Sequence, residues 1–257
     1  MHALLVKTSS LGDVVHNLPV VTDIQQHFPD AIIDWVVEES FADIPRLHPG
    51  VRRVIPVAMR RWRKHLFAPS TWREIAAFRR DLRDDFYDVV LDTQGLLKSA
   101  LIARQAELAV GGRRSGYAAE AAREPLAAKC YDDTIVIPKN AHAVDRNRWL
   151  AAAAFGYSPS ETLDYGIAAP PLRAGWVPSG RYAVLLTGTS RADKLWAETS
   201  WIALACELGL PVVMPAGSDN ERERAQRLAA KIPGATTAPA LRIAELAGLL
   251  AGASIVI

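Results

Sequence analysis

Short apolar runs alternate with longer segments of helical periodicity along the first part of the chain. Strands are predicted at residues 3–6, 32–37, 89–91 and 134–137, and helices at residues 14–27, 96–106 and 144–155. This alternation is typical of a parallel sheet with helices on both faces. We therefore predict that residues 1–158 form one Rossmann-like α/β domain.

The periodicity fades between residues 159 and 181, where prolines and glycines accumulate, so this segment is the predicted linker. The alternation then resumes, with strands predicted at residues 182–186, 212–214 and 254–257 and helices at residues 196–208, 220–231 and 241–251. Residues 182–257 are accordingly predicted to form a second Rossmann-like domain. Because no element follows its last strand to cover it, we expect this domain to be incomplete in a sequence that stops at Ile257.

Composition narrows the class of protein. Half of the 257 residues are hydrophobic and the formal net charge is +2, so the chain is globular and its total charge demands neither nucleic acid nor membrane. Neither the two cysteines nor any histidine pair has metal-ligand spacing. The longest apolar run, residues 246–257, is shorter than the roughly 20 residues of a transmembrane helix. We expect a cytoplasmic protein without a metal site, whose membrane contact is at most peripheral.

Each predicted domain begins with a strand that leads through small polar residues into a helix. In the first loop Asp13 lies at a helix start, where it either stabilises the helix dipole or serves a ligand site. The second loop carries Lys194 before a helix, where its charge opposes the dipole unless an anion shares the site. A phosphate ligand and a solvated lysine are both consistent with this position. Glu221, after the next strand, is placed either to bind ribose hydroxyls or to stabilise a first helical turn.

A basic segment at residues 51–65 contains no acidic residue. It is suited to a polyanion or an anionic membrane, although a solvated charged surface has the same pattern. The acids after it, Glu74, Asp81, Asp84 and Asp85, are predicted to form an exposed helix face. Lys98, Arg123 and Arg146 add cations near other predicted strand ends, each of which is either a surface residue or a ligand.

Several stretches together resemble the lipopolysaccharide heptosyltransferases of glycosyltransferase family 9, and among them the branch that adds the first heptose to Kdo-lipid A. They include Val6-Lys-Thr-Ser-Ser-Leu-Gly-Asp13, Arg60-Arg-Trp-Arg-Lys64, Asp92-Thr-Gln-Gly95, Ala122-Arg-Glu-Pro125 and Thr189-Ser-Arg-Ala-Asp-Lys194. The resemblance covers essentially the whole chain. It implies a GT-B fold of two facing Rossmann-like domains. It also implies inverting heptose transfer from ADP-L-glycero-β-D-manno-heptose without metal or other cofactor.

The resemblance also implies roles for individual residues. Asp13 would be the general base that deprotonates the acceptor hydroxyl of Kdo. Donor binding would involve Ser10, Gly12, Thr189, Ser190, Lys194, Glu221 and Leu241. Binding of the acidic Kdo-lipid A acceptor would involve Arg60, Arg61, Arg63, Lys64, Lys98, Arg123 and Arg146. The protein would lie peripherally on the cytoplasmic face of the anionic inner membrane and would bind no nucleic acid.

Three alternative functions remain open from the sequence. A non-catalytic module that binds a nucleotide sugar or polyanion would share the same loops. A nucleic-acid binder is suggested by the basic segment alone, with Trp62 as its one interleaved aromatic residue. A nucleotide-sugar epimerase would share the twin Rossmann-like layout.

Overall fold

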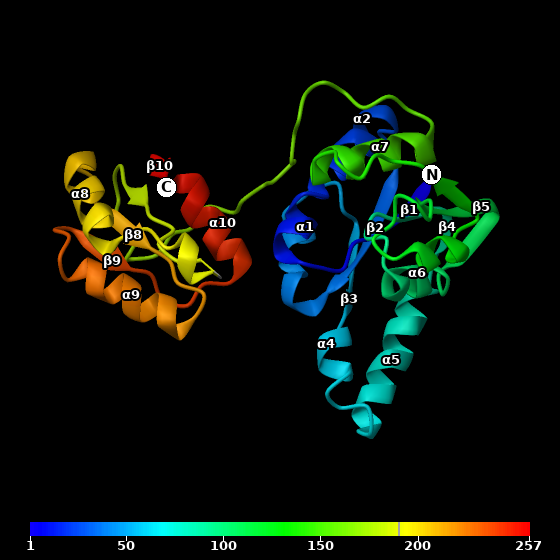
Figure 1. Cartoon of the computed structure of the whole chain (residues 1–257), viewed down its shortest axis with the longest axis horizontal. Helices are drawn as coiled ribbons and strands as arrows, with labels where there is room; N and C mark the ends of the chain where they lie inside the picture. The colour runs from blue at the N-terminus through cyan, green and yellow to red at the C-terminus, as the bar shows by residue number, and fades with distance from the viewer. Residues whose placement is uncertain (190) are drawn as a thin grey trace. The chain divides into compact units, whose positions relative to one another are not determined.

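The computed structural model describes residues 1–189 and 191–257. The chain divides into two compact units, Met1–Ala168 and Ala169–Ile257 (Figure 1). The division falls inside the predicted linker, and the residues on either side of it are held by their own unit. Ala168 N donates to Leu47 O at 2.8 Å in unit 1, whereas Leu172 packs on the core of unit 2.

Unit 1 contains a six-stranded sheet in the order β3-β2-β1-β4-β5-β6, and all five strand pairs are parallel. Its strands are β1 (His2–Val6), β2 (Ile32–Glu38), β3 (Arg53–Val57), β4 (Phe86–Asp92), β5 (Glu107–Tyr117) and β6 (Asp133–Ile135). The strand order reverses between β1 and β4, where the connections leave on opposite faces. Loops at the carboxyl ends of these two strands therefore border a crevice, which is the usual ligand site of such sheets.

The helices of unit 1 lie around the sheet, and two of them also extend beyond it (Figure 1). They are α1 (Leu11–Val15), α2 (Leu18–His27), α3 (Asp43–Arg46), α4 (Met59–Trp62), α5 (Pro69–Leu82), α6 (Leu97–Ala103) and α7 (Ala143–Phe155), with 3₁₀ turns η1 (Glu39–Phe41) and η2 (Pro125–Cys130). The predicted single helix over residues 14–27 is wrong. It is split into α1 and α2, because Pro19 has no N–H to donate to Val15 O and instead occupies the first turn of α2.

The basic segment at residues 51–65 is not one continuous patch. It contains β3 and α4, which carry Arg52 and Arg53 to one end of the sheet and Arg60 and Arg61 to the other. The prediction that the following acids form only an exposed helix face is also wrong. Asp84 and Asp85 lie beyond the end of α5, and the half-exposed Glu74 bonds Trp62 Nε1 and Arg61.

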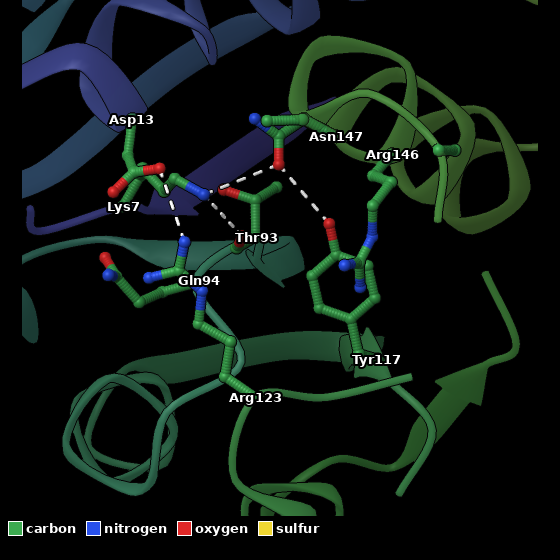
Figure 2. Close-up of a pocket in the computed structure, with 10 residues that line it drawn as sticks. Lys7, Asp13, Thr93, Gln94, Tyr117, Arg123, Arg146 and Asn147 are labelled. Carbon is green, nitrogen blue, oxygen red and sulfur yellow. Dashed lines mark hydrogen bonds and ion pairs between the residues drawn. The ribbon is translucent and has the colours of Figure 1, made fainter. Parts of the chain in front are cut away.

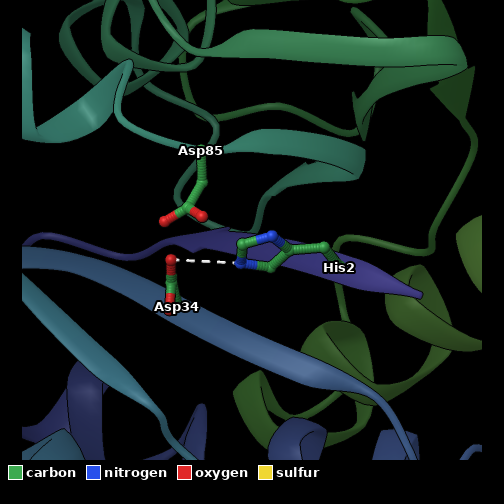
Figure 3. Close-up of side chains that lie close together, drawn as sticks. All are labelled: His2, Asp34 and Asp85. Atoms are coloured by element: carbon green, nitrogen blue, oxygen red, sulfur yellow. Dashed lines mark hydrogen bonds and ion pairs between the residues drawn. The ribbon is translucent and has the colours of Figure 1, made fainter.

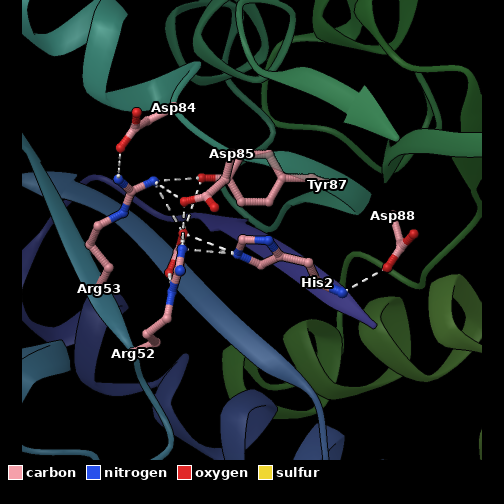
Figure 4. Close-up of polar contacts among 8 residues, drawn as sticks. His2, Arg52, Arg53, Asp84, Asp85, Tyr87 and Asp88 are labelled. Carbon is pink, nitrogen blue, oxygen red and sulfur yellow. Dashed lines mark hydrogen bonds and ion pairs between the residues drawn. The ribbon is translucent and has the colours of Figure 1, made fainter. Parts of the chain in front are cut away.

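An ion-pair cluster closes the amino ends of the strands (Figure 4). Arg52 holds the fully buried carboxylate of Asp34 with two bonds, Nε to Oδ1 at 2.9 Å and Nη2 to Oδ2 at 2.6 Å. Tyr87 Oη donates to the same carboxylate at 3.1 Å. Arg52 Nη2 and Arg53 Nη2 also contact Asp85, at 2.6 and 2.8 Å.

His2, Asp34 and Asp85 have ligand atoms within 4.8 Å of one another, a spacing that is compatible with a metal ion (Figure 3). Both carboxylates, however, already bind guanidinium groups. Two fixed positive charges at these oxygens disfavour a cation there. We therefore interpret the group as a structural ion-pair cluster.

Unit 2 contains a four-stranded parallel sheet in the order β10-β7-β8-β9. Its elements are β7 (Ala183–Val184), η3 (Ala192–Lys194), α8 (Glu198–Leu208), β8 (Val212–Met214), α9 (Asp219–Ala229), β9 (Ala235–Thr237), α10 (Ile243–Gly252) and β10 (Ile255–Val256). Read from β9, this order repeats β3-β2-β1-β4 of unit 1, so both units have Rossmann-like connectivity. Across the described ranges, no helix is long and apolar enough to cross a bilayer.

We expect Asp34→Asn to lower the free energy of unfolding by about 2–3 kcal/mol at neutral pH, because it removes the anion shared by Arg52 and Arg53. Burial alone would raise the pKa of Asp34, but its hydrogen bond and charge interactions, chiefly with Arg52, lower it below 3.8. A depressed pKa stabilises the folded state above the unfolded-state pKa, and that stabilisation is lost as pH falls through the folded value. Urea denaturation should show a gap between wild type and variant that narrows below pH 3.8. A gap that stays constant as the pH falls from 3.8 through this lower range would contradict this role.

Candidate functional site

A pocket of about 100 Å³ lies at the carboxyl ends of β1, β4 and β5 in unit 1 (Figure 2). Parallel strands end at the same edge of a sheet, so side chains distant in sequence converge there. Its polar lining consists of Lys7, Asp13, Thr93, Gln94, Tyr117, Arg123, Arg146 and Asn147. The lining combines one carboxylate with three cationic side chains, a composition that favours an anionic ligand.

Asp13 lies in α1 and serves both the helix and the pocket. Its Oδ2 accepts hydrogen bonds from Ser10 N at 3.0 Å and Ser10 Oγ at 3.1 Å, which anchors the start of α1. Its Oδ1 faces Arg123 Nη2 at 3.5 Å. Burial would raise the pKa of Asp13, but the Ser10 N–H and the charges of Lys7 and Arg123 outweigh it and lower the pKa below 3.8. Asp13 therefore anchors the start of α1 and also lines the pocket, and its role toward a ligand stays a prediction.

Lys7 is a buried cation in the pocket wall that sequence reasoning missed. Lys7 comes directly after β1. Its Nζ donates to Thr93 O at 2.7 Å and to Asn147 Oδ1 at 3.4 Å. Burial lowers the pKa of Lys7 from 10.5 to about 8, against the opposing charges of Asp13 and Asp92. Lys7 therefore stays mostly charged at neutral pH. The available sequence signal was a lysine directly after a predicted strand, in the loop for which a ligand site was one of two interpretations.

Gln94 fixes the first loop to the loop that follows β4. Its Oε1 accepts from Thr8 N at 2.8 Å and Ser9 N at 3.2 Å, and its Nε2 donates to Ser9 O at 2.7 Å. Asp92 supports the same turn by accepting from Gln94 N at 2.7 Å. Gly95 has φ +66°, and an added Cβ would lie 3.1 Å from Tyr117, so glycine suits this position. The wall of the pocket is therefore held by side-chain bonds between distant loops.

The opposite wall is formed by β5 and α7. Tyr117 Oη donates to Asn147 Oδ1 at 3.3 Å, which joins it to Lys7 through a shared acceptor. Arg146 lies over the Tyr117 ring, 5.0 Å from its centroid, and donates to Ala121 O at 2.7 Å. The hydroxyl of Thr93 is buried and has no hydrogen-bond partner among the described residues, so it is available to a ligand.

The predicted acceptor-binding cations fall into separate places. Arg123 and Arg146 line the Asp13 pocket, and Lys98 on α6 contacts Ser9 Oγ at 3.5 Å beside it. A second hollow, of about 410 Å³, is lined by Glu38, Glu39, Ser40, Arg60, Arg61, Lys64 and His65. Arg61 has its charge offset there by Glu39 and Glu74, at 2.9 and 2.7 Å. Arg63 is exposed at the end of α4 and does not line this hollow.

Unit 2 brings Glu221 and Leu241 together at the carboxyl ends of β7 and β8. They line a pocket of about 240 Å³ with Leu186, Gly188, Pro215, Ala216, Gly217 and Leu246. Glu221 Oε2 accepts from Gly217 N at 2.7 Å, and a Cβ on Gly188 would lie 2.7 Å from the Glu221 carboxyl carbon. The absence of a side chain at residue 188 therefore lets the carboxylate approach this loop.

Among the described residues, the other predicted donor-binding positions do not line that pocket. Thr189 is half-buried, Lys194 is exposed in η3, and Ser190 lies outside the described residues. Ser10 and Gly12 belong to unit 1, where Ser10 precedes α1 and Gly12 is exposed within it.

Residues 75–257 match the family described as glycosyltransferase family 9 (heptosyltransferase). The chain belongs to this family. It is 45% identical over its whole length to lipopolysaccharide heptosyltransferase 1 of Escherichia coli K12, of which it covers 81%. It is 46% identical over 98% of its length to lipopolysaccharide heptosyltransferase 1 of Pseudomonas aeruginosa, of which it covers 71%.

A solved structure of a heptosyltransferase is also similar to this family 9 chain. The structure of the E. coli heptosyltransferase WaaC with ADP-2-deoxy-2-fluoro heptose is 44% identical in sequence to this chain. The two structures match with a TM-score of 0.89, and the match covers all of this chain and 82% of the other. The family resemblance and the predicted fold class are thereby confirmed.

We expect Lys7→Met to raise the free energy of unfolding by about 1–2 kcal/mol at pH 7. The lowering of the Lys7 pKa from 10.5 to about 8 corresponds to a cost of about 3 kcal/mol for the buried charge. Removing the charge recovers this cost, and loss of the hydrogen bond to Thr93 O offsets part of the recovered stability. This cost is present below pH 8 and is relieved as pH rises toward 10.5, because the folded state releases its proton first. Urea denaturation across this range should show the two stabilities converging above pH 8. A variant less stable than wild type at pH 7 would contradict the charge cost.

Proposed function

We propose that the chain transfers heptose from ADP-L-glycero-β-D-manno-heptose to a Kdo hydroxyl of Kdo-lipid A, with inversion and without a metal ion. The observation that carries this proposal is the ionised Asp13 in a small pocket with Lys7, Arg123 and Arg146. Kdo is a sugar acid, so a pocket with three cations suits its carboxylate, and Asp13 supplies the one group able to accept its hydroxyl proton. Similarity to heptosyltransferase 1 across the whole chain supports the choice of donor and acceptor.

The proposed reaction is a single displacement. The Kdo hydroxyl oxygen forms a bond to the anomeric carbon of heptose, the bond from that carbon to the diphosphate oxygen breaks, and ADP leaves with the electron pair. Asp13 takes the hydroxyl proton. Because the pKa of Asp13 is below 3.8, the carboxylate is a weak base, and proton transfer should lag behind departure of ADP.

The donor is assigned mainly to unit 2. We assign the ribose hydroxyls to Glu221 and the adenine ring to Leu241, and the assignment is supported by the pocket that these two residues line together. We assign the diphosphate to Thr189, Ser190 and Lys194, since a cation there would stabilise the charge that develops on ADP. Ser10 and Gly12 complete the donor assignment from unit 1.

The acceptor is assigned to unit 1, whose cations would meet the carboxylates and phosphates of Kdo-lipid A. They are Arg60, Arg61, Arg63, Lys64, Lys98, Arg123 and Arg146. Because this acceptor is a membrane lipid, we also propose peripheral contact with the cytoplasmic face of an anionic inner membrane.

Mass spectrometry of Kdo-lipid A after incubation with the chain, ADP-heptose and EDTA tests the function. We expect one heptose to be added and ADP to be released in equal amount. Consumption of ADP-heptose without the acceptor, giving an isomerised sugar, would favour an epimerase. Donor binding without turnover would favour a non-catalytic module, and activity abolished by EDTA would contradict the metal-independent mechanism.

We expect Asp13→Asn to lower kcat by roughly 10²–10⁴-fold, because the amide accepts no proton, while ADP affinity stays within about twofold. The amide oxygen can still accept from Ser10, so α1 should remain folded. Asp30→Asn, at an exposed turn of the same unit, is the matched control and should turn over normally. Steady-state rates and calorimetric titration with ADP measure the two effects. Near-normal turnover of the Asp13 variant would remove it from the base role.

We expect Glu221→Gln to weaken ADP binding by roughly 5–20-fold, because hydrogen bonds to a carboxylate are stronger than those to an amide. The amide oxygen retains an acceptor for Gly217 N. Glu223→Gln, on an exposed face of the same helix, is the control and should leave the affinity unchanged. Isothermal titration calorimetry provides the comparison. Equal affinities for both variants would exclude Glu221 from the ribose site.

A further inference from the structure

Helices α4 and α5 extend away from the sheet of unit 1, and residues 63–68 connect them at the far end (Figure 1). Three large apolar side chains are exposed there. Leu66 is 46% exposed, Phe67 101% and Trp72 59%. We call these three residues the apolar tip. Leaving so much apolar surface in water is unfavourable, which indicates that a partner covers it.

The apolar tip is held outward by an ordered base. Trp62 is buried and packs edge-on against Phe78, with ring centroids 5.9 Å apart. Trp62 Nε1 also donates to Glu74 Oε2 at 2.8 Å. These contacts join α4 to α5 directly behind the exposed residues. The exposure of the tip is therefore built into the fold.

Polar groups in and beside the apolar tip bond to one another. Trp72 Nε1 donates to Leu66 O at 2.9 Å, and Thr71 Oγ1 donates to His65 O at 2.8 Å. Ala68 N donates to the same His65 oxygen at 3.0 Å. A polar group without a partner is costly in an apolar medium, so a turn that satisfies its own groups can enter one at lower cost.

The surroundings of the tip are cationic. Residues 60–73 contain no aspartate or glutamate. Arg63, Lys64 and Arg73 are exposed, and within the described ranges no acidic side chain pairs with them. The nearest following acid, Glu74, is already bonded to Arg61 and Trp62. Anionic headgroups are thus the complement of this surface.

We propose that the apolar tip inserts Leu66, Phe67 and Trp72 into the headgroup layer of an anionic bilayer, with Arg63, Lys64 and Arg73 on the lipid phosphates. Aromatic and aliphatic residues beside basic ones are the composition of interfacial anchors. Three apolar residues are too few for a stable protein interface, whereas a shallow lipid anchor needs no more. This inference deepens the proposed function, on which it rests: it names the surface through which the chain meets the membrane that carries its acceptor.

Flotation with acceptor-free vesicles of phosphatidylethanolamine and phosphatidylglycerol tests the proposal. We expect Phe67→Gln to reduce vesicle binding at least about tenfold relative to wild type. Val110→Gln is the matched control, because Val110 is also fully exposed, at 107%, on β5 of the same unit. The Val110→Gln variant should bind the vesicles as wild type does. Pure phosphatidylcholine vesicles should bind wild type weakly.

The proposal would be overturned if Phe67→Gln bound the vesicles as well as wild type does. It would also be overturned if Phe67→Gln and Val110→Gln lost vesicle binding to the same extent. Concentration-dependent self-association in gel filtration that Phe67→Gln abolishes would also overturn it, because a second copy would then cover the tip. Rates with a deacylated, water-soluble acceptor should be the same for Phe67→Gln and wild type. Vesicle binding needs no turnover, so a chain that binds vesicles through the tip but transfers no heptose would refute only the proposed reaction.

Discussion

The pocket of unit 1 depends on keeping one carboxylate ionised at a partly buried position. Burial pushes the pKa of Asp13 upward, and the Ser10 N–H with the charges of Lys7 and Arg123 pushes it below 3.8. The Asp13 side chain also lines the pocket. The proposed general-base role near neutral pH requires this ionised state, and the low basicity of the carboxylate would leave much of the proposed catalysis to donor activation.

The sheet provides the positions that this balance requires. β1 and β4 are neighbours where the strand order reverses, so Lys7 follows one strand and Thr93 follows the other at the same edge. Gln94 then joins the two loops through bonds to Thr8 and Ser9. At the amino ends of the strands, the Asp34 cluster joins β2, β3 and β4. The ion-pair cluster and the candidate site thus lie at opposite ends of one sheet.

The sequence predicted the two Rossmann-like units and the loops of Asp13 and Glu221, because strand, small polar loop and helix start are all local signals. It missed β3 and β5, in which arginines and glycines interrupt the apolar pattern, and the three-residue strand β9. Lys7 was missed because its burial depends on Thr93 and Asn147, which are 86 and 140 residues away. The neutralisation of Arg61 was missed for the same reason, since Glu39 reaches it from another element.

The ionisation state of Asp13 can be measured directly. A ¹³C NMR titration of the carboxyl carbon, assigned by its loss in Asp13→Asn, reports the pKa in the folded chain. We expect a midpoint below the ordinary value of 3.8 and an ionised carboxylate throughout the neutral range. A midpoint at or above 3.8 would contradict the electrostatic balance on which the proposed base role depends.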